Sequence, residues 1–287
     1  MWRRTSIKAV AVTPQLVGSA AILIVIAPLM PEWAQVVTAL MLMPVVAIAF
    51  GLGEPLACWV LRGTRPPRAD EEQALAPAVT QVAASVRWPP DVQIRVLPHA
   101  WRVDVGATGR RTLLVTDGLY RALQEQTLSE PAAAALLHHG LGRLAAKTTR
   151  YDLAIEAASL PIAGPLRVAR WILGRLRALT FGQGVWAARG VIGLLAVAQA
   201  GWSGQWPLAA ALAVLVVMSY TTVWAKRSWA RIDQEIGDEA VIDAGLGPDL
   251  ADVLGAVGVL TPQRRLRLDR PRAQLRLVDT DANTGSR

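Results

Sequence analysis

Long apolar runs divide the chain into blocks, and the first two lie close to its start. One run extends from Val10 to Met30 and another from Ala34 to Val60, with the short turn Pro31–Trp33 between them. About 20 apolar residues suffice to cross the hydrocarbon core of a bilayer, so the pattern predicts a pair of membrane spans. Glu54 is the one charged residue in these runs. We expect it either near the lipid headgroups or in a polar contact with another helix.

Two further apolar runs lie in the second half of the chain. Trp206–Trp224 has no charged residue and carries tryptophan at both ends, as is typical of an interfacial aromatic belt. Val185–Trp202 contains Arg189 near its start, a side chain long enough to reach the membrane interface. These runs predict a second pair of spans, joined at Gly201–Gln205.

The region between the two pairs has the pattern of a small α+β domain. Glu71–Val86 places its apolar residues on one helical stripe. Thr127 and Glu130 have the spacing of a capping box, which predicts that another helix begins there. Between these helices, turn residues separate three runs of strand character: Val92–Leu97, Trp101–Val105 and Thr112–Thr116.

The remaining segments are charged or amphipathic. Pro165–Phe181 alternates apolar residues with four arginines, which is typical of a helix lying on an anionic membrane surface. After the fourth apolar run, Arg231–Ala244 and Asp249–Val259 predict two short helices. The segment Arg264–Arg287 is charged and poorly patterned, which predicts a disordered tail.

The positive charge lies beside the apolar runs and predicts their orientation. The net charge is +8, although only 18% of the residues are charged, where soluble domains carry about a quarter. Neither hairpin tip has Lys or Arg, and the flanks that carry them are Arg3 to Lys8, Arg62 to Arg68 and Lys226 to Arg231. By the positive-inside rule, we expect a multi-pass protein of the cell (inner or plasma) membrane with both termini cytoplasmic. The bilayer accounts for the basic charge, so nucleic acid is not an expected partner. The single cysteine, Cys58, allows no disulfide framework.

The order of these parts resembles that of the HtpX-like membrane zinc metallopeptidases, which share the CAAX-prenyl-protease-like peptidase domain. Three stretches carry the resemblance: Pro98–Leu119, Leu128–Leu144 and Arg231–Gly247. It covers most of Asp70–Val259 together with the membrane layout, and its specificity lies in the order and spacing of the three stretches. It implies a membrane hairpin, a cytosolic helix and small sheet, an HExxH helix, a second membrane pair and a helix with a Glu ligand.

The fold class expected from pattern and resemblance together is a mainly α membrane protein. Four transmembrane helices would carry a small cytosolic α+β zincin-like domain. The expected segments are a transmembrane hairpin (1–62), a peptidase-like part with a degenerate HExxH helix (63–152), an amphipathic membrane-surface region (153–184), a second transmembrane pair (185–224), helices completing the peptidase-like domain (225–262) and a disordered tail (263–287).

The residues that would perform the family's zinc chemistry are replaced in this chain. The family binds zinc through two His four residues apart and a distant Glu, and the Glu after the first His is the general base. When HGLGR is set against HELGH, His139 takes the first ligand position, Gly140 the base position and Arg143 the second ligand position. The family's distant Glu stands in an E-x-x-x-D arrangement, and with Asp238 aligned to that Asp, Gln234 falls at the position of the Glu. Arg cannot ligate a cation, so the resemblance implies a degenerate site, and no metal or other cofactor is expected.

Other registers leave some alternatives open. A register that starts at His138, or a one-residue slip that brings in Glu235, supplies other ligands but no base. His138 and His139 are also compatible with ordinary packing in an alanine-rich helix. Because Arg143 stands at a ligand position, we expect its guanidinium to form an ion pair with the distant helix, with Asp238 as the preferred partner and Glu235 as the second.

Three functions follow as hypotheses. The replaced positions favour an inactive pseudo-peptidase of protein quality control, which binds the bilayer and a membrane or unfolded protein client. The second is an active zinc metalloendopeptidase that uses His138, His139 and Glu235, although adjacent helical residues point about 100° apart. The third is an unrelated membrane accessory protein.

Overall fold

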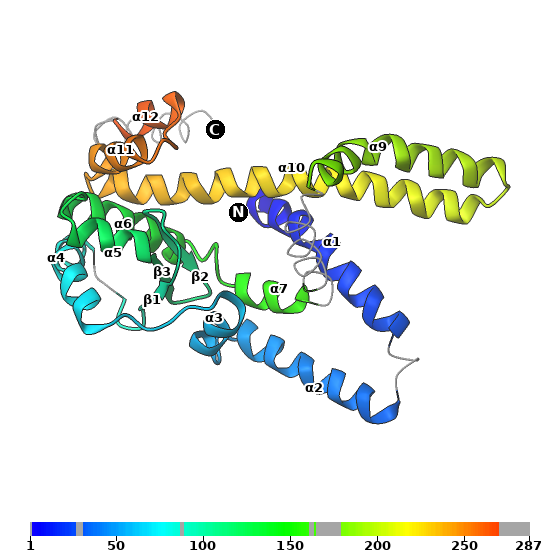
Figure 1. Cartoon of the computed structure of the whole chain (residues 1–287), viewed down its shortest axis with the longest axis horizontal. Coiled ribbons are helices and arrows are strands. Elements are labelled where there is room, and N and C mark those ends of the chain that lie inside the picture. The colour runs from blue at the N-terminus through cyan, green and yellow to red at the C-terminus, as the bar shows by residue number, and fades with distance from the viewer. Residues whose placement is uncertain (1, 27–30, 87–88, 161–163, 165–178, 270–287) are drawn as a thin grey trace, which may run out of the picture. The chain divides into compact units, whose positions relative to one another are not determined.

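The protein is described by a computed structural model, which covers residues 2–26, 31–86, 89–160, 164 and 179–269 (Figure 1). The chain divides into two compact units. We call them the helical unit (Met1–Val45 with Ile155–Ile232) and the mixed unit (Val46–Ala154 with Asp233–Arg287). The long helix α10 (Trp206–Asp243) contributes to both. The chain is mainly helical with one small sheet, as predicted.

The helical unit contains α1 (Trp2–Ile26), most of α2 (Glu32–Ala49), α9 (Leu179–Trp202) and the first part of α10. A tight turn with Gly204 at φ 72° joins α9 to α10. Gly190 and Gly193 of α9 lie directly against Tyr220 and Val216 of α10, where no Cβ would fit. Small residues at such contacts let two helix backbones approach closely, so the predicted helical hairpin forms. The amphipathic helix predicted for Pro165–Phe181 lies outside the described residues except for its last three.

The helices at the predicted membrane spans were compared with the length and hydropathy that a span requires. Within the described residues, no single helix is both long enough and apolar enough to cross a bilayer. One bent pair meets the criterion jointly, Met43–Ala49 with Glu54–Arg62, at an angle of 117°. The prediction of one continuous helix over Ala34–Val60 is therefore wrong. The helix breaks because Gly51 and Gly53 adopt positive φ, a conformation that glycine reaches without strain.

The mixed unit is built on a three-stranded sheet in the order β1-β3-β2. β1 (Gln93–Leu97) pairs with β3 (Thr112–Thr116) in parallel, and β2 (Val105–Thr108) pairs with β3 in antiparallel fashion. The first and third predicted strands are confirmed. The second prediction, Trp101–Val105, was placed too early, because the β2–β3 register pairs Val105 with Val115 and Thr108 with Thr112. Trp101 is instead 68% exposed and lies 4.1 Å from the guanidinium of Arg121.

Helices cover the sheet and close the core (Figure 1). The central one is α6 (Glu130–Ala145), whose residues from Ala132 to His138 are all buried. It begins later than the capping-box pair predicted, because Ser129 is the N-cap and accepts a hydrogen bond from the backbone N–H of Ala132. The other helices of this unit are α3 (Glu54–Arg62), α4 (Ala69–Ser85), α5 (Asp117–Gln124), α11 (Gly247–Ala256) and α12 (Pro262–Leu268). The helix α7 (Asp152–Ala158) contains the boundary in sequence between the two units.

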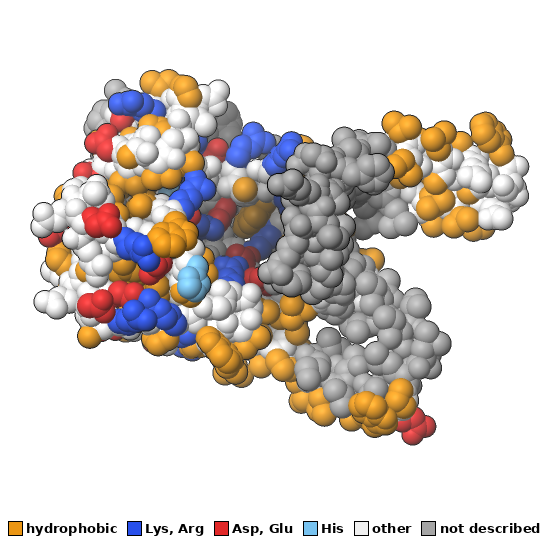
Figure 2. Space-filling model, viewed as in Figure 1, with side chains coloured by type: hydrophobic (Ala, Val, Ile, Leu, Met, Phe, Trp, Pro, Cys, Tyr) orange, Lys and Arg blue, Asp and Glu red, His pale blue; other side chains and the backbone are white. Residues whose placement is uncertain are grey.

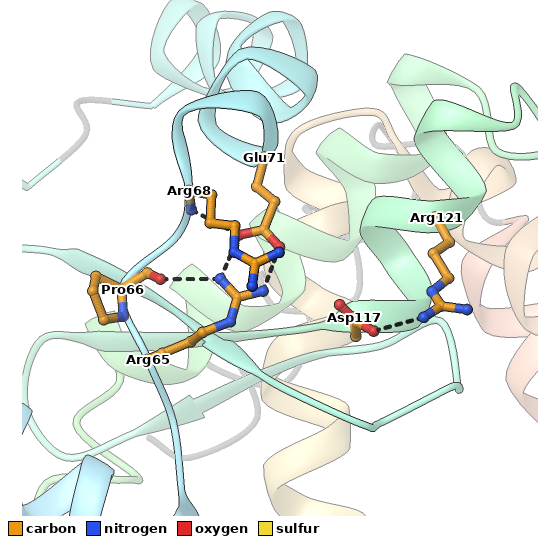
Figure 3. Close-up of polar contacts among 6 residues, drawn as sticks. All are labelled: Arg65, Pro66, Arg68, Glu71, Asp117 and Arg121. Carbon is orange, nitrogen blue, oxygen red and sulfur yellow. Dashed lines mark hydrogen bonds and ion pairs between the residues drawn. The ribbon is translucent and has the colours of Figure 1, made fainter.

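The segment before α4 is fixed to the domain by Arg65 (Figure 3). Its guanidinium donates to both carboxylate oxygens of Glu71, and its backbone forms a bridge with Val96 of β1. Glu71 also accepts from the backbone N–H of Arg68 at 2.7 Å, as an N-terminal helical carboxylate should. These donors, chiefly Arg65, hold the pKa of Glu71 below its ordinary value. The α4 helix is therefore anchored at its start to the edge of the sheet.

Candidate functional site

Glycines place α6 directly against its neighbours. At Gly142 an added Cβ would collide with the side chain of Ala240 on α10. At Gly140, the position of the family's general base, a Cβ would lie 2.8 Å from Leu113 and 3.2 Å from Val105, both in the sheet. A longer side chain has no room there, so this position faces packed core and not a reaction site.

The two adjacent histidines of α6 have different surroundings. His138 is buried, and its Nε2 lies 2.7 Å from Oγ of Ser85 in α4. Burial lowers the pKa of His138, which keeps the imidazole neutral. The ring of His139 instead packs against Gly237 of α10, so closely that a Cβ added at Gly237 would collide with it. Nε2 of His139 lies 3.5 Å from Oδ1 of Asp238. The structure does not bring the two rings to one site.

Asp238 is the centre of a buried polar cluster. Its carboxylate is fully buried and receives two hydrogen bonds from Arg264 of α12, from Nε at 3.0 Å and from Nη2 at 2.6 Å. This fork-to-carboxylate geometry is the strong form of an Arg–Asp pair. Burial alone would raise the pKa of Asp238, but His139 and Arg264 outweigh it and hold the pKa below its ordinary value of 3.8. The carboxylate is therefore ionised throughout the neutral range.

Gln234, at the position of the family's distant Glu, faces the same guanidinium. With its amide oxygen turned towards Arg264, it accepts from Nε at 3.0 Å. Gln234 and Asp238 therefore both contact Arg264, and His139 contacts Asp238. We call these four residues the Arg264 cluster. It joins α6, α10 and α12 through the buried ion pair of Asp238 and Arg264.

Arg143 forms an ion pair with α10, but its partner is not the one predicted. Its Nη2 contacts Oδ2 of Asp233, and Oδ1 of Asp233 accepts from Thr148 at 2.6 Å. The pairing follows from the antiparallel packing of α6 and α10. Since His139 meets α10 near Gly237, a residue one turn later on α6 meets α10 about one turn earlier, at Asp233.

Glu235, the second predicted partner, lies outside the Arg264 cluster. It is about half exposed, and its Oε1 lies 3.5 Å from Nη1 of Arg267. It reaches neither Arg143 nor the two histidines in any described contact. The ligand set His138, His139 and Glu235 therefore has no common centre in the described structure.

The residues at the aligned zinc position do not fit a zinc ion. Structural and catalytic zinc sites use at least three protein ligands from Cys, His and carboxylates. In the part of the chain that the structure describes, no three such residues converge. Oδ1 of Asp238, the one carboxylate oxygen near His139, already accepts from Arg264. The arrangement can hold three helices together, and no step of metal chemistry follows from it.

Arg264 is the functional residue that the sequence analysis missed. It was placed at the start of a disordered tail, whereas the structure forms α12 over Pro262–Leu268. The signal was present, because Thr261 followed by proline is a typical helix start. Thr261 indeed accepts from the backbone N–H of Arg264. The rest of the predicted tail, from residue 270 onwards, lies outside the described residues.

Comparisons with protein-family models, with curated proteins and with solved structures gave no match for this chain.

Proposed function

We propose that this chain is an integral membrane pseudo-peptidase of the HtpX-like type, without peptidase activity, which acts by binding a membrane or unfolded protein client. The observation that carries the proposal is the Arg264 cluster. In the register of the resemblance, His139 and Gln234 take two of the metal-ligand positions and Asp238 takes the position of the family's Asp, and the cation that Gln234 and Asp238 contact is a guanidinium. A permanent side-chain cation would retain the helix packing of the family while removing its chemistry.

The surface of the α9–α10 hairpin supports the membrane part of the proposal. From Gly190 to Ala225 the sequence has no charged residue, and many of its large apolar side chains are exposed. Trp202, Trp206, Leu194, Leu195 and Val217 are between 60% and 90% exposed. Figure 2 shows the far end of this hairpin covered by hydrophobic and uncharged side chains. Exposed apolar surface of this extent is typical of contact with lipid or a partner protein.

The four-span topology predicts which positions are accessible from outside the cell. With Cys58 replaced by alanine, a cysteine introduced at Glu32 or Gly204 should react with a membrane-impermeant thiol reagent on intact cells. A cysteine at Arg68 should react only after the membrane is opened, because the positive flank is cytoplasmic. Reaction of the Gly204 position from the cytoplasmic side alone would remove the α9–α10 pair of spans from the proposal.

The purified protein should not cleave casein or a membrane protein substrate. A general base typically contributes about 10²–10⁴ in rate, and the base position is Gly140, which faces the sheet. Cleavage would be assayed with and without a chelator, beside a His139→Ala variant and an active HtpX-like peptidase. Chelator-sensitive cleavage that is lost in His139→Ala, together with near-stoichiometric zinc in the purified protein, would establish the active-enzyme alternative.

A further inference from the structure

The mixed unit contains a cavity of about 950 Å³ between the end of α2, the β2–β3 loop, α6 and the end of α10. This volume is at the upper end of the range of about 300–1,000 Å³ for small-molecule sites. The walls are largely apolar and include Val92, Leu141 and Leu144. His139, Asp238 and Arg264 are not among the lining residues, so the cavity is separate from the Arg264 cluster.

Four cationic side chains also line this apolar space: Arg110, Arg111, Lys147 and Arg150. The acidic lining residues are Asp91 and Asp243, so cations are in excess. Among the described residues, none of the four cations forms an ion pair with a carboxylate. A set of cations beside an apolar wall, without acidic partners, is electrostatically complementary to an anion.

Two of these arginines carry buried hydrogen-bond donors that no described residue satisfies. The Nε–H groups of Arg110 and Arg150 are both buried and have no acceptor among the described residues. Arg110 is nevertheless held in place, because its Nη2 donates to the backbone oxygen of Ala49 at 2.7 Å. A buried donor without a partner costs about 1–3 kcal/mol, and an anionic oxygen would satisfy it. The observation points to a ligand with anionic oxygens.

The rim of the cavity continues into exposed apolar surface. Phe50 and Leu52, which line it, are 70% and 66% exposed. On the following helix α3, the large apolar side chains of Leu56 and Trp59 are also about 60% exposed. A ligand with an apolar part would therefore find apolar contacts both at the entrance and on the walls.

We propose that this cavity binds a single-chain anionic amphiphile, with its phosphate or carboxylate against Arg110, Arg111 and Arg150 and its acyl chain along the apolar walls. A free anion would leave the apolar walls uncovered, and a neutral lipid would leave the arginine donors unsatisfied. The site does not depend on the pseudo-peptidase proposal, because it uses none of the residues of the Arg264 cluster.

The test uses the full-length protein in a nonionic detergent and counts bound molecules by native mass spectrometry. The probes are dodecyl phosphate, dodecanol and inorganic phosphate. Dodecyl phosphate should bind one per chain, and each of the other two should bind at least about tenfold more weakly, since each loses one of the two contributions. Equal affinity for dodecanol would overturn the anion site. Equal affinity for inorganic phosphate would overturn the acyl-chain site.

Variants of residues that line the cavity test whether dodecyl phosphate binds there. Arg111→Gln combined with Arg150→Gln should weaken dodecyl phosphate binding at least about tenfold, because two charge-assisted contacts are lost. Ala145→Trp adds bulk at an exposed lining position and should also reduce binding. Arg102→Gln, an exposed arginine that does not line the cavity, is the matched control and should bind as the parent does. Parental affinity in both cavity variants would overturn the proposal. If the double variant fails to fold, the single Arg150→Gln removes one of the proposed charge contacts and should still weaken binding of dodecyl phosphate.

Discussion

Replacing Arg264 by alanine is expected to lower the free energy of unfolding of the mixed unit by about 3–5 kcal/mol. The loss is this large because Asp238 is fully buried and would keep its charge without its strongest partner. Arg264 itself is 7% exposed, so solvent screening does not reduce the effect to that of a surface ion pair. Denaturant unfolding of the detergent-solubilised protein measures it, with hydrogen exchange in α10 and α12 as the local probe.

Two variants show whether a stranded charge causes this loss. Arg267→Ala removes a cation of the same helix that is only partly buried and lies 3.5 Å from half-exposed Glu235, and it should cost at most about 1 kcal/mol. The double variant Arg264→Met with Asp238→Leu removes both charges and should recover most of the stability, since apolar replacements of a buried pair are often neutral. An Arg264→Ala protein as stable as the parent would show that the Arg264 cluster does not hold the three helices together.

Replacing Glu54 by alanine is the second change with a large expected effect, a loss of about 3 kcal/mol or more. Glu54 is buried in the first turn of α3, and its Oε1 accepts from the backbone N–H groups of Arg110 and Arg111 and from Oγ1 of Thr112. A buried donor left without an acceptor costs about 1–3 kcal/mol, and here three donors lose one acceptor. The β2–β3 loop should therefore open, which hydrogen exchange of residues 109–112 would detect.

Glu54→Gln is the informative comparison, because it keeps an oxygen at the accepting position. It should lose much less stability than Glu54→Ala. Glu72→Ala, which removes an exposed carboxylate from the first turn of α4, should change stability by about 0.5 kcal/mol or less. If Glu54→Ala unfolds at the same denaturant concentration as Glu72→Ala, the hydrogen bonds to the loop contribute little.

The structure also decides the surroundings of Glu54, for which the sequence allowed two alternatives. We expected it near the lipid headgroups or in contact with another helix. The structure places its carboxylate on a β-hairpin loop instead, against Gly109, where any Cβ would collide with Glu54. The interaction joins residues more than fifty positions apart in the chain. No local pattern signals such a contact, because it arises only when α3 and the sheet have assembled.

The sequence alone predicted those helices and strands whose pattern of apolar residues is visible within a short segment. The α4 helix and the strand β1 formed nearly as predicted, because the period of their apolar residues, 3.6 or 2, reflects burial of one face. The strand β3 also formed as predicted, but it is buried along its whole length, as a short apolar run between turns can be. These elements could be predicted because burial against the core leaves its period in the local sequence.

The tertiary structure decided which residues meet. The sequence predicted that a guanidinium pairs with Asp238, but it assigned that role to Arg143, which pairs with Asp233. Arg264, from a segment predicted to be disordered, binds Asp238. The antiparallel direction of α6 and α10 sets the first pairing, and the docking of α12 on α10 sets the second. Charge pairing acts over a few ångströms in space and has no period along the chain, so the partner of each charge followed only from the packing of the helices.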